Sequence, residues 1–242
     1  MGIRIDRDKC TGCGSCESAC PFGAITIVDN LAQIGEGCNL CGACREACSF
    51  GAVIIDIPKA PEGPDDSKGV WVFAEQRDGR IKGVAYELLS KGRELADGLG
   101  TELSAVCLGH NVQGVEELGE YGADRVFYFD DPALAQFQED IYTACLVDLI
   151  REHRPQILLA GATSLGRALI PRVGTIIETG LTADCTGLDI DPETGLLRQT
   201  RPTFGGNIMA TILCKVRRPQ MATVRPHVFK KALPQPGRKA RV

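Results

Sequence analysis

The sequence has few aromatic residues, few histidines and no long apolar run. Aromatic side chains make up 5% of its 242 residues, with one tryptophan, and there are three histidines. No apolar stretch approaches the roughly 20 residues that a membrane-spanning helix needs, so no segment is expected to span a bilayer. His110, His153 and His227 belong to no Ser/His/Asp or metal-binding arrangement, so none is assigned to catalysis.

Further absences narrow the function. The chain lacks both the GxxxxGK phosphate loop and the GxGxxG dinucleotide fingerprint. Residues 215–242 carry nine Lys or Arg and no Asp or Glu, against a net charge of −4 for the whole chain. Because aromatic residues are nearly missing there, we expect this segment to face an acidic partner or another domain, and no nucleic acid. The charged N-terminus lacks the apolar core of a signal peptide, so a cytoplasmic location is predicted.

Cysteine, in contrast, is abundant. Eight of the 12 cysteines lie in two copies of one spacing, "CTGCGSCESACP" from Cys10 and "CNLCGACREACS" from Cys38. Clustered cysteines in a reducing compartment are more often metal ligands than disulfides. The first copy is the C-x2-C-x2-C-x3-C-P run that holds 4Fe-4S clusters in bacterial ferredoxins. The sequence therefore predicts two 4Fe-4S clusters.

In two-cluster proteins the last cysteine of each run ligates the other cluster. The predicted ligands of the first cluster are therefore Cys10, Cys13, Cys16 and Cys48, and those of the second are Cys38, Cys41, Cys44 and Cys20. A pair of zinc sites is the alternative, but two cysteine pairs per site would leave the repeated third and fourth cysteines unexplained. Ser49 stands where the second copy would usually have proline, which removes no ligand.

The repeat extends beyond the ligands, because both copies continue as Phe-Gly-Ala. Strand-like residues 3–5 and 52–57 could pair and close a small α+β module over residues 1–57, which resembles a bacterial two-cluster ferredoxin. Residues 58–69, "PKAPEGPDDSKG", are rich in proline, glycine and charge and predict a linker. The four remaining cysteines, Cys107, Cys145, Cys185 and Cys214, lie in apolar surroundings and are expected to fill core positions.

From Val70 onward, apolar runs alternate with helix-like segments. Buried strands are predicted at 70–75, 103–109, 125–129 and 157–161, and helices at 82–98, 111–121, 134–153 and 164–178. Such alternation predicts a three-layer α/β domain with a parallel sheet. A turn at 191–195 separates two strand-like runs, and "NIMATIL" and "QMATVRP" continue the β character, so antiparallel strands should be appended to that sheet.

Several blocks of this second half resemble the N-terminal domain of the alpha subunit of electron transfer flavoproteins. They are "VWVFAEQRDG", "HRPQILLAGATSLGRALIPRV", "ETGLTADCTGLDID" and "QTRPTFGGNIMATILCKVRRPQMATVRP", over about residues 70–229. The resemblance implies a beta-subunit partner that holds FAD. It also implies a second FAD-binding domain after residues 230–242, which then form a basic tail leading to a domain absent from this sequence.

With a ferredoxin module in front of this domain, the chain resembles the minority of these alpha subunits that are found in anaerobes. Some of these work with acyl-CoA dehydrogenase-type or lactate dehydrogenase partners in flavin-based electron bifurcation. The expected function is therefore that of an electron carrier, not an enzyme by itself. It would pass single electrons between a flavin or dehydrogenase and a low-potential carrier such as ferredoxin.

The resemblance also implies positions near a flavin or a subunit interface. Arg167 and Arg172 follow "GATSLG", which links a predicted strand to a helix, and Arg201 begins a loop that contains two adjacent glycines. Each arginine could instead be an ordinary solvated side chain. Two other functions stay open: an iron–sulfur redox sensor or adenine-nucleotide-binding module, and, less favoured for want of a phosphate loop, a nucleotide-hydrolysing enzyme.

Overall fold

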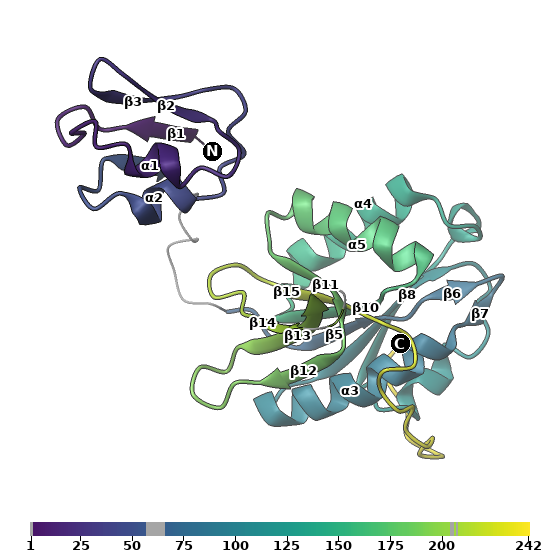
Figure 1. The fold of residues 1–242 in the computed structure, drawn as a ribbon. Helices are drawn as coiled ribbons and strands as arrows, with labels where there is room; N and C mark the ends of the chain where they lie inside the picture. Colours follow the sequence, from purple (N-terminus) through teal and green to yellow (C-terminus); the bar gives the residue numbers. More distant parts are fainter. Residues whose placement is uncertain (1, 57–65, 204–205, 207) are drawn as a thin grey trace. The chain divides into compact units, whose positions relative to one another are not determined.

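The computed structural model describes residues 2–56, 66–203, 206 and 208–242. The chain divides into two compact units, Met1–Gly63 and Pro64–Val242 (Figure 1). Most of the predicted linker, residues 58–65, lies outside the described residues, and residues 66–69 precede the first strand of the second unit. Each unit is described by itself.

The first unit has the pairing that its sequence predicts. Strands β1 (Gly2–Ile5) and β4 (Val53–Asp56) come from its two ends and pair antiparallel, with Ile3 opposite Ile55. A hairpin of β2 (Ile25–Val28) and β3 (Leu31–Ile34) lies between two short helices in the chain, α1 (Ser15–Ser18) and α2 (Ala43–Ala47). The helices are equivalent elements of the repeat, and each carries the third cysteine of its run.

Few apolar side chains are buried in this unit. Its fully buried cluster consists of two cysteines and three aliphatic residues: Cys16, Ile25, Ala32, Cys44 and Val53. Three more cysteines and five isoleucines pack around them, partly exposed. Because so small a core supplies little burial free energy, units of this size usually need a metal or disulfides for stability. The cysteines thus occupy the centre of the unit.

The second unit is built on a six-stranded parallel sheet in the order β11-β15-β10-β5-β8-β9. Its strands in chain order are β5 (Val70–Phe73), β8 (Leu103–Gly109), β9 (Arg125–Asp130), β10 (Ile157–Gly161), β11 (Leu181–Cys185) and β15 (Gln220–Val224). The strands β5, β8, β10 and β15 are buried along their whole lengths. Continuous burial of this kind is typical of interior parallel strands, which are covered on both faces.

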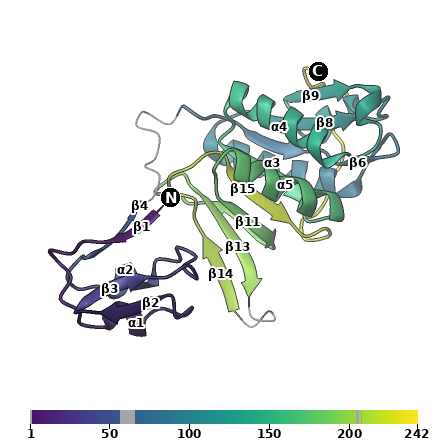
Figure 2. The same ribbon diagram turned by 90° about the horizontal axis from the view of Figure 1, so that it is seen from above.

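Helices cover both faces of this sheet, giving three layers (Figures 1 and 2). Helix α3 (Gly83–Leu99) packs one face through Leu88 and Leu89, and α4 (Glu139–His153) and α5 (Ser164–Ile176) pack the other. A two-stranded ribbon, β6 (Gln76–Arg77) and β7 (Arg80–Ile81), precedes α3. The predicted α/β architecture is therefore confirmed.

A separate three-stranded antiparallel sheet is appended, as predicted. It contains β12 (Gly187–Ile190), β13 (Leu197–Thr203) and β14 (Ile208–Ile212) in that order. The predicted turn joins β12 to β13, where Asp191 accepts the N–H groups of Glu193 and Thr194 on its side chain. Strand β14 is an edge, and four of its five residues are exposed. Residues 204, 205 and 207 of the glycine-containing loop lie outside the described residues.

Three sequence expectations were wrong in detail. "QMATVRP" contributes β15, which lies parallel between β10 and β11 and does not extend the antiparallel sheet. Residues 111–121 form turns and the short 3-10 helix Glu116–Gly119, because Asn111 and Gly114 have φ +50° and +80°, values that a right-handed helix does not contain. The helix expected from residue 134 begins at Glu139, after the 3-10 turn Pro132–Leu134.

The basic segment 230–242 packs back onto the second unit. The N–H of Val126 in β9 donates to the carbonyl of Arg241 at 2.7 Å. Nζ of Lys231 lies 4.2 Å and 4.6 Å from the ring centroids of Tyr86 and Tyr121. Arg238 pairs with Asp124 at 2.7 Å. Several of the predicted free positive charges are therefore used within the chain, and we call residues 230–242 the strap.

Candidate iron–sulfur centres

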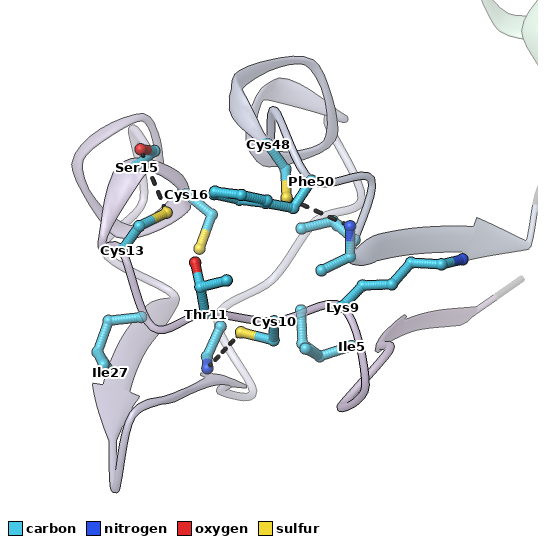
Figure 3. A pocket seen from close by; sticks show the side chains of 13 residues that line it. Ile5, Lys9, Cys10, Thr11, Cys13, Ser15, Cys16, Ile27, Cys48 and Phe50 are labelled. Carbon is cyan, nitrogen blue, oxygen red and sulfur yellow. Dashed lines mark hydrogen bonds between the residues drawn. The ribbon is translucent and has the colours of Figure 1, made fainter.

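The first cysteine-lined hollow gathers cysteines from both halves of the first unit (Figure 3). Its lining contains the cysteines Cys10, Cys13, Cys16 and Cys48. Apolar side chains, among them Ile5, Ile27 and Phe50, complete the wall. Three cysteines of the first run thus face the last cysteine of the second.

The second hollow has the reciprocal composition. Cys38, Cys41, Cys44 and Cys20 line it. The fourth cysteine of each hollow therefore comes from the other run. The grouping of side chains is the one that the predicted ligand sets require. The ligand assignment itself stays a prediction.

Backbone N–H groups point at several of these sulfurs. The N–H of Ala24 donates to Sγ of Cys20 and that of Ala52 to Sγ of Cys48, both at 3.3 Å. The N–H of Ala32 donates to Sγ of Cys10 at 3.4 Å. Such donors stabilise the negative charge that a thiolate carries when it binds metal. Both copies therefore treat their crossing cysteine in the same way.

Glycines allow the chain to turn tightly around the hollows. Gly12 has φ +67°, and a Cβ there would lie 2.6 Å from the carbonyl oxygen of Asn30. Gly14 and Gly42 precede the two helices with φ +76° and +87°. Leu40 takes the place of Gly12 in the second copy and also has a positive φ, +61°, which is costly for a leucine. The loop geometry is thus kept even where glycine is not.

The environments of the thiols differ within each run. Burial raises the pKa of Cys16 and of Cys44, the third cysteines of the two runs, above the usual range. The hydrogen bond between Sγ of Cys13 and Oγ of Ser15, 3.5 Å long, lowers the pKa of the exposed Cys13 thiol. A buried thiol becomes a ligand only if the metal compensates the cost of its negative charge.

The residues fit a cluster better than a single ion. A zinc ion needs four ligands at about 2.0–2.3 Å from one point. Within residues 2–56, 66–203, 206 and 208–242, no three His, Cys, Asp or Glu side chains are gathered closely enough to hold one metal ion. The four thiols in each hollow instead surround a volume, lined by apolar atoms and aimed N–H groups. A compact metal–sulfide cage suits this arrangement.

In the second unit, Arg167 lies at a basic cluster beside a bulge. Strand β11 is irregular between Thr182 and Cys185, and Asp184 there has φ +60°. Its carboxylate lies 3.1 Å from Arg167 in the first turn of α5 and 3.9 Å from Arg225. The bulge therefore aims one carboxylate at two guanidinium groups. Arg167 remains 57% exposed and can reach a partner.

The other two predicted arginines lie in different surroundings. Arg172 pairs with Glu139 and Asp140 at the start of α4, so it ties α5 to α4 and does not join Arg167. Arg201 lies on β13, and its Nε is buried without a hydrogen-bond partner among the described residues. Its charge acts on the thiol of Cys185, whose pKa burial raises to about 11. Arg201 and Arg167 thus both interact with residues of β11, Arg201 with Cys185 and Arg167 with Asp184.

Sequence reasoning missed a buried carboxylate at the carboxyl edge of the sheet. Glu75 follows β5 and is 8% exposed. The hydroxyl of Thr163, which caps α5 by accepting the N–H of Gly166, donates to Oε2 of Glu75 at 2.5 Å. Burial raises the pKa of Glu75. An acidic residue directly after an all-apolar strand was the available signal. A carboxylate here disfavours phosphate at this helix N-terminus.

Comparisons with known families agree with both halves of this description. The model of the electron transfer flavoprotein domain matches residues 70–242, well over half of the chain. The chain belongs to the electron transfer flavoprotein family. Two models of 4Fe-4S binding domains match residues 3–26 and 38–52, which contain the two cysteine runs. The matched family region includes the strap.

Relatives of this electron transfer flavoprotein chain include proteins named electron transfer flavoprotein subunit alpha and FixB. The electron transfer flavoprotein subunit alpha of Clostridium acetobutylicum is 56% identical over 167 residues, covering 69% of this chain and 50% of that protein. Protein FixB of Clostridium saccharobutylicum is 55% identical over 166 residues, with the same coverage. The acryloyl-CoA reductase electron transfer subunit beta of Anaerotignum propionicum is 44% identical over 188 residues, covering 68% and 51%. The chain thus spans about half the length of these relatives.

No helix among the described residues combines the length and the apolar character needed to cross a membrane.

Proposed function

We propose that this subunit passes single electrons between a flavin or dehydrogenase partner and a low-potential carrier. The observation that carries the proposal is the pair of four-cysteine hollows in a chain whose second unit belongs to the electron transfer flavoprotein family. No substrate chemistry is assigned to the chain itself. The reaction is carried out by a complex, and this subunit supplies the route for electrons.

The two hollows hold one 4Fe-4S cluster each in this proposal. Bound clusters would supply one-electron reduction and oxidation. The protein's part is to hold the eight thiolates, to direct the N–H groups of Ala24, Ala32 and Ala52 at sulfur, and to keep water away with apolar walls. Donors of this kind and exclusion of solvent are what set the reduction potential of a cluster.

The proposed partner is an electron transfer flavoprotein beta subunit that carries FAD, with an acyl-CoA dehydrogenase-type or another dehydrogenase beyond it. The alpha-subunit and acryloyl-CoA reductase relatives support this pairing by their names. Exposed apolar side chains at Ile208, Met209, Ile212 and Val216 mark β14 and the segment after it as a surface for a protein partner. A ferredoxin is the proposed low-potential electron carrier. Flavin-based electron bifurcation is one reaction in which such a complex would take part. The proposed location is the cytoplasm.

Arg167, Arg172 and Arg201 are proposed to lie toward the flavin or the subunit interface. The exposure of Arg167 and the unpartnered Nε of Arg201 support that role for these two. Arg172 has the weakest support, since its guanidinium already pairs with α4. A second FAD-binding domain, of the kind that follows this region in the family, is proposed for the whole protein.

Metal analysis with a ligand variant tests the proposal. After anaerobic reconstitution the chain should contain about eight irons and eight acid-labile sulfides, with broad absorption near ~400 nm. Cys20→Ser should lose or alter the cluster of Cys38, Cys41 and Cys44 while the other cluster persists. Cys214→Ser, which changes a cysteine outside both hollows, is the matched control.

Three results would contradict parts of this scheme. About two zinc ions per chain without visible absorption would refute the iron–sulfur assignment. Damage by Cys20→Ser confined to the cluster of Cys10, Cys13 and Cys16 would refute the crossing of ligands. Failure to bind any flavoprotein beta subunit would refute the proposed partner.

A further inference from the structure

The Phe-Gly-Ala repeat after each cysteine run has a common local structure. Gly23 and Gly51 turn the chain with φ +58° and +62°. The alanine that follows each of them donates its N–H to the crossing cysteine, as described above. The sharp turn therefore fixes the phenylalanine beside the sulfur, although that phenylalanine takes no part in the hydrogen bond. The ligand geometry alone does not require an aromatic residue there.

Both phenylalanines are unusually exposed for their size. Phe22 is 56% exposed and Phe50 is 53% exposed, so neither belongs to the core of the unit. Each lines a hollow: Phe50 the one with Cys48, and Phe22 the one with Cys20. Figure 3 shows the Phe50 ring between Cys16 and Cys48, across the hollow from Cys10. Each phenylalanine is thus exposed to solvent and also lines a cysteine-containing hollow.

Solvent at this place matters because reduction adds negative charge to a cluster. Water stabilises added charge, and an apolar group that displaces water disfavours it. Solvent exposure is one of the factors that set cluster potentials. A phenyl ring over the opening therefore lowers the potential, and it also slows the approach of oxidants. The same ring at the same position in both copies suggests that both clusters need this protection.

We propose that Phe50 shields the cluster at Cys10, Cys13, Cys16 and Cys48 from solvent, and that Phe22 shields the cluster at Cys38, Cys41, Cys44 and Cys20. The inference rests on the proposed iron–sulfur function. It assigns two positioning residues that act on the potential and oxidative stability of the clusters without ligating them. Because of the crossing, each phenylalanine protects the cluster that its neighbouring fourth cysteine serves.

Replacement of each phenylalanine by glutamine and by leucine, which have similar volumes but differ in polarity, tests the shield. Phe50→Gln, Phe50→Leu, Phe22→Gln and Phe22→Leu are reconstituted in the full chain, with iron measured in each. Redox titration followed by electron paramagnetic resonance gives the two potentials, and loss of absorption in air gives the oxidation rate. Val28→Ala is the control, since Val28 is an exposed aliphatic residue of this unit, 42% accessible, that lines neither hollow.

We expect Phe50→Gln to raise one potential and Phe22→Gln the other. A three- to tenfold increase in the reduced-to-oxidised ratio at fixed potential corresponds to ~30–60 mV for one electron. The double Gln variant should raise both, and bleaching in air should be faster. The Leu variants should stay near the parent values. Val28→Ala should change nothing.

Other outcomes overturn the inference. With about eight irons retained, unchanged potentials in both Gln variants refute the shield while leaving the proposed function intact. Equal shifts from Gln and Leu at one position would indicate a packing role and not solvent exclusion. A parent chain that binds no iron contradicts the proposed function and the shield together.

Discussion

Asp124 joins the strap to the α/β unit, and its replacement by asparagine should destabilise that unit measurably. Its carboxylate accepts a hydrogen bond from the N–H of Leu103 in β8 at 2.9 Å. It also pairs with Arg93 of α3 and with Arg238 of the strap, both at 2.7 Å. Three separate parts of the unit therefore meet at one side chain, which is 30% exposed.

The expected loss follows from these contacts. A hydrogen bond to a charged group contributes roughly 1.5–3 kcal/mol when buried, whereas exposed ion pairs contribute about 0–1 kcal/mol. With Asp124 partly exposed, each guanidinium contact is assigned ~1 kcal/mol, so Asp124→Asn should cost about 2 kcal/mol. For a domain of about 150–250 residues this corresponds to a fall in Tm of roughly 4–8 °C.

The pH dependence provides a second signature of Asp124. Burial raises the pKa of this carboxyl, but the Leu103 N–H and the guanidinium groups of Arg93 and Arg238 outweigh it, so the folded pKa lies below the usual value. The contribution to stability is therefore present above the unfolded pKa of about 3.9 and is lost as pH falls through the lower folded pKa. The difference between parent and Asp124→Asn should shrink in that acid range.

Trp71 makes the measurement specific for one unit. It is the chain's single tryptophan and is 3% exposed in β5, so its fluorescence follows unfolding of the α/β unit alone. Asp97→Asn is the matched control, because Asp97 also contacts Arg93, at 2.8 Å, but is 67% exposed. Its loss should stay below about 0.5 kcal/mol. Equal losses in the two variants, or a loss below that value for Asp124→Asn, would refute the reasoning.

Two further predictions use the same unit. Because burial raises the folded pKa of Glu75, the stability that its protonated form confers is present below about pH 4.3 and is lost as pH rises through the folded pKa. The urea midpoint of Glu75→Gln, monitored by Trp71 fluorescence, should therefore rise relative to that of the parent as pH increases. A difference between the two midpoints that is the same at all pH values would contradict this. Met209→Asp on β14 should weaken binding of a beta subunit by about tenfold or more, since a buried methionine contributes roughly 1.5–3 kcal/mol. Calorimetric titration would check this, with Leu233→Asp, 87% exposed on the strap, as a control that binds normally.

The sequence alone was sufficient for features that repeat or alternate. The cysteine spacing predicted the two groups of thiols, and the apolar runs predicted β8 and β10 with their observed bounds. Strand β15 was misread because "QMATV" mixes apolar and polar letters, as an antiparallel strand does, although all five of its residues are buried. The buried polar residues Gln220 and Thr223 find partners on neighbouring segments, which no local pattern reveals.

Contacts between distant residues that no repeat or spacing signals could not be predicted. The basic segment looked like a surface for a partner, yet Arg238 and Arg241 pair with Asp124 and Glu102, more than a hundred positions earlier. Glu75 and Thr163 likewise lie 88 positions apart and meet only because β5 and β10 are neighbours in the sheet. Composition gives the charge of a segment, but the fold decides whether that charge stays available.

The exchange of cysteines between the two runs has a consequence for the folding of the first unit. Each run supplies three thiols to its own hollow and takes the fourth from the other, so neither half completes a site alone. The buried apolar cluster is small and itself contains Cys16 and Cys44, whose thiolates would be costly to bury without metal. Binding free energy from the metal is then part of the folding free energy of both halves. The β1–β4 pair also holds the two halves together, since its backbone hydrogen bonds join the first strand of the unit to the last. Unfolding of the unit should therefore release both clusters, whereas loss of a single ligand, as in Cys20→Ser, leaves the other cluster in place. In this way the redox function is linked directly to the stability of the unit.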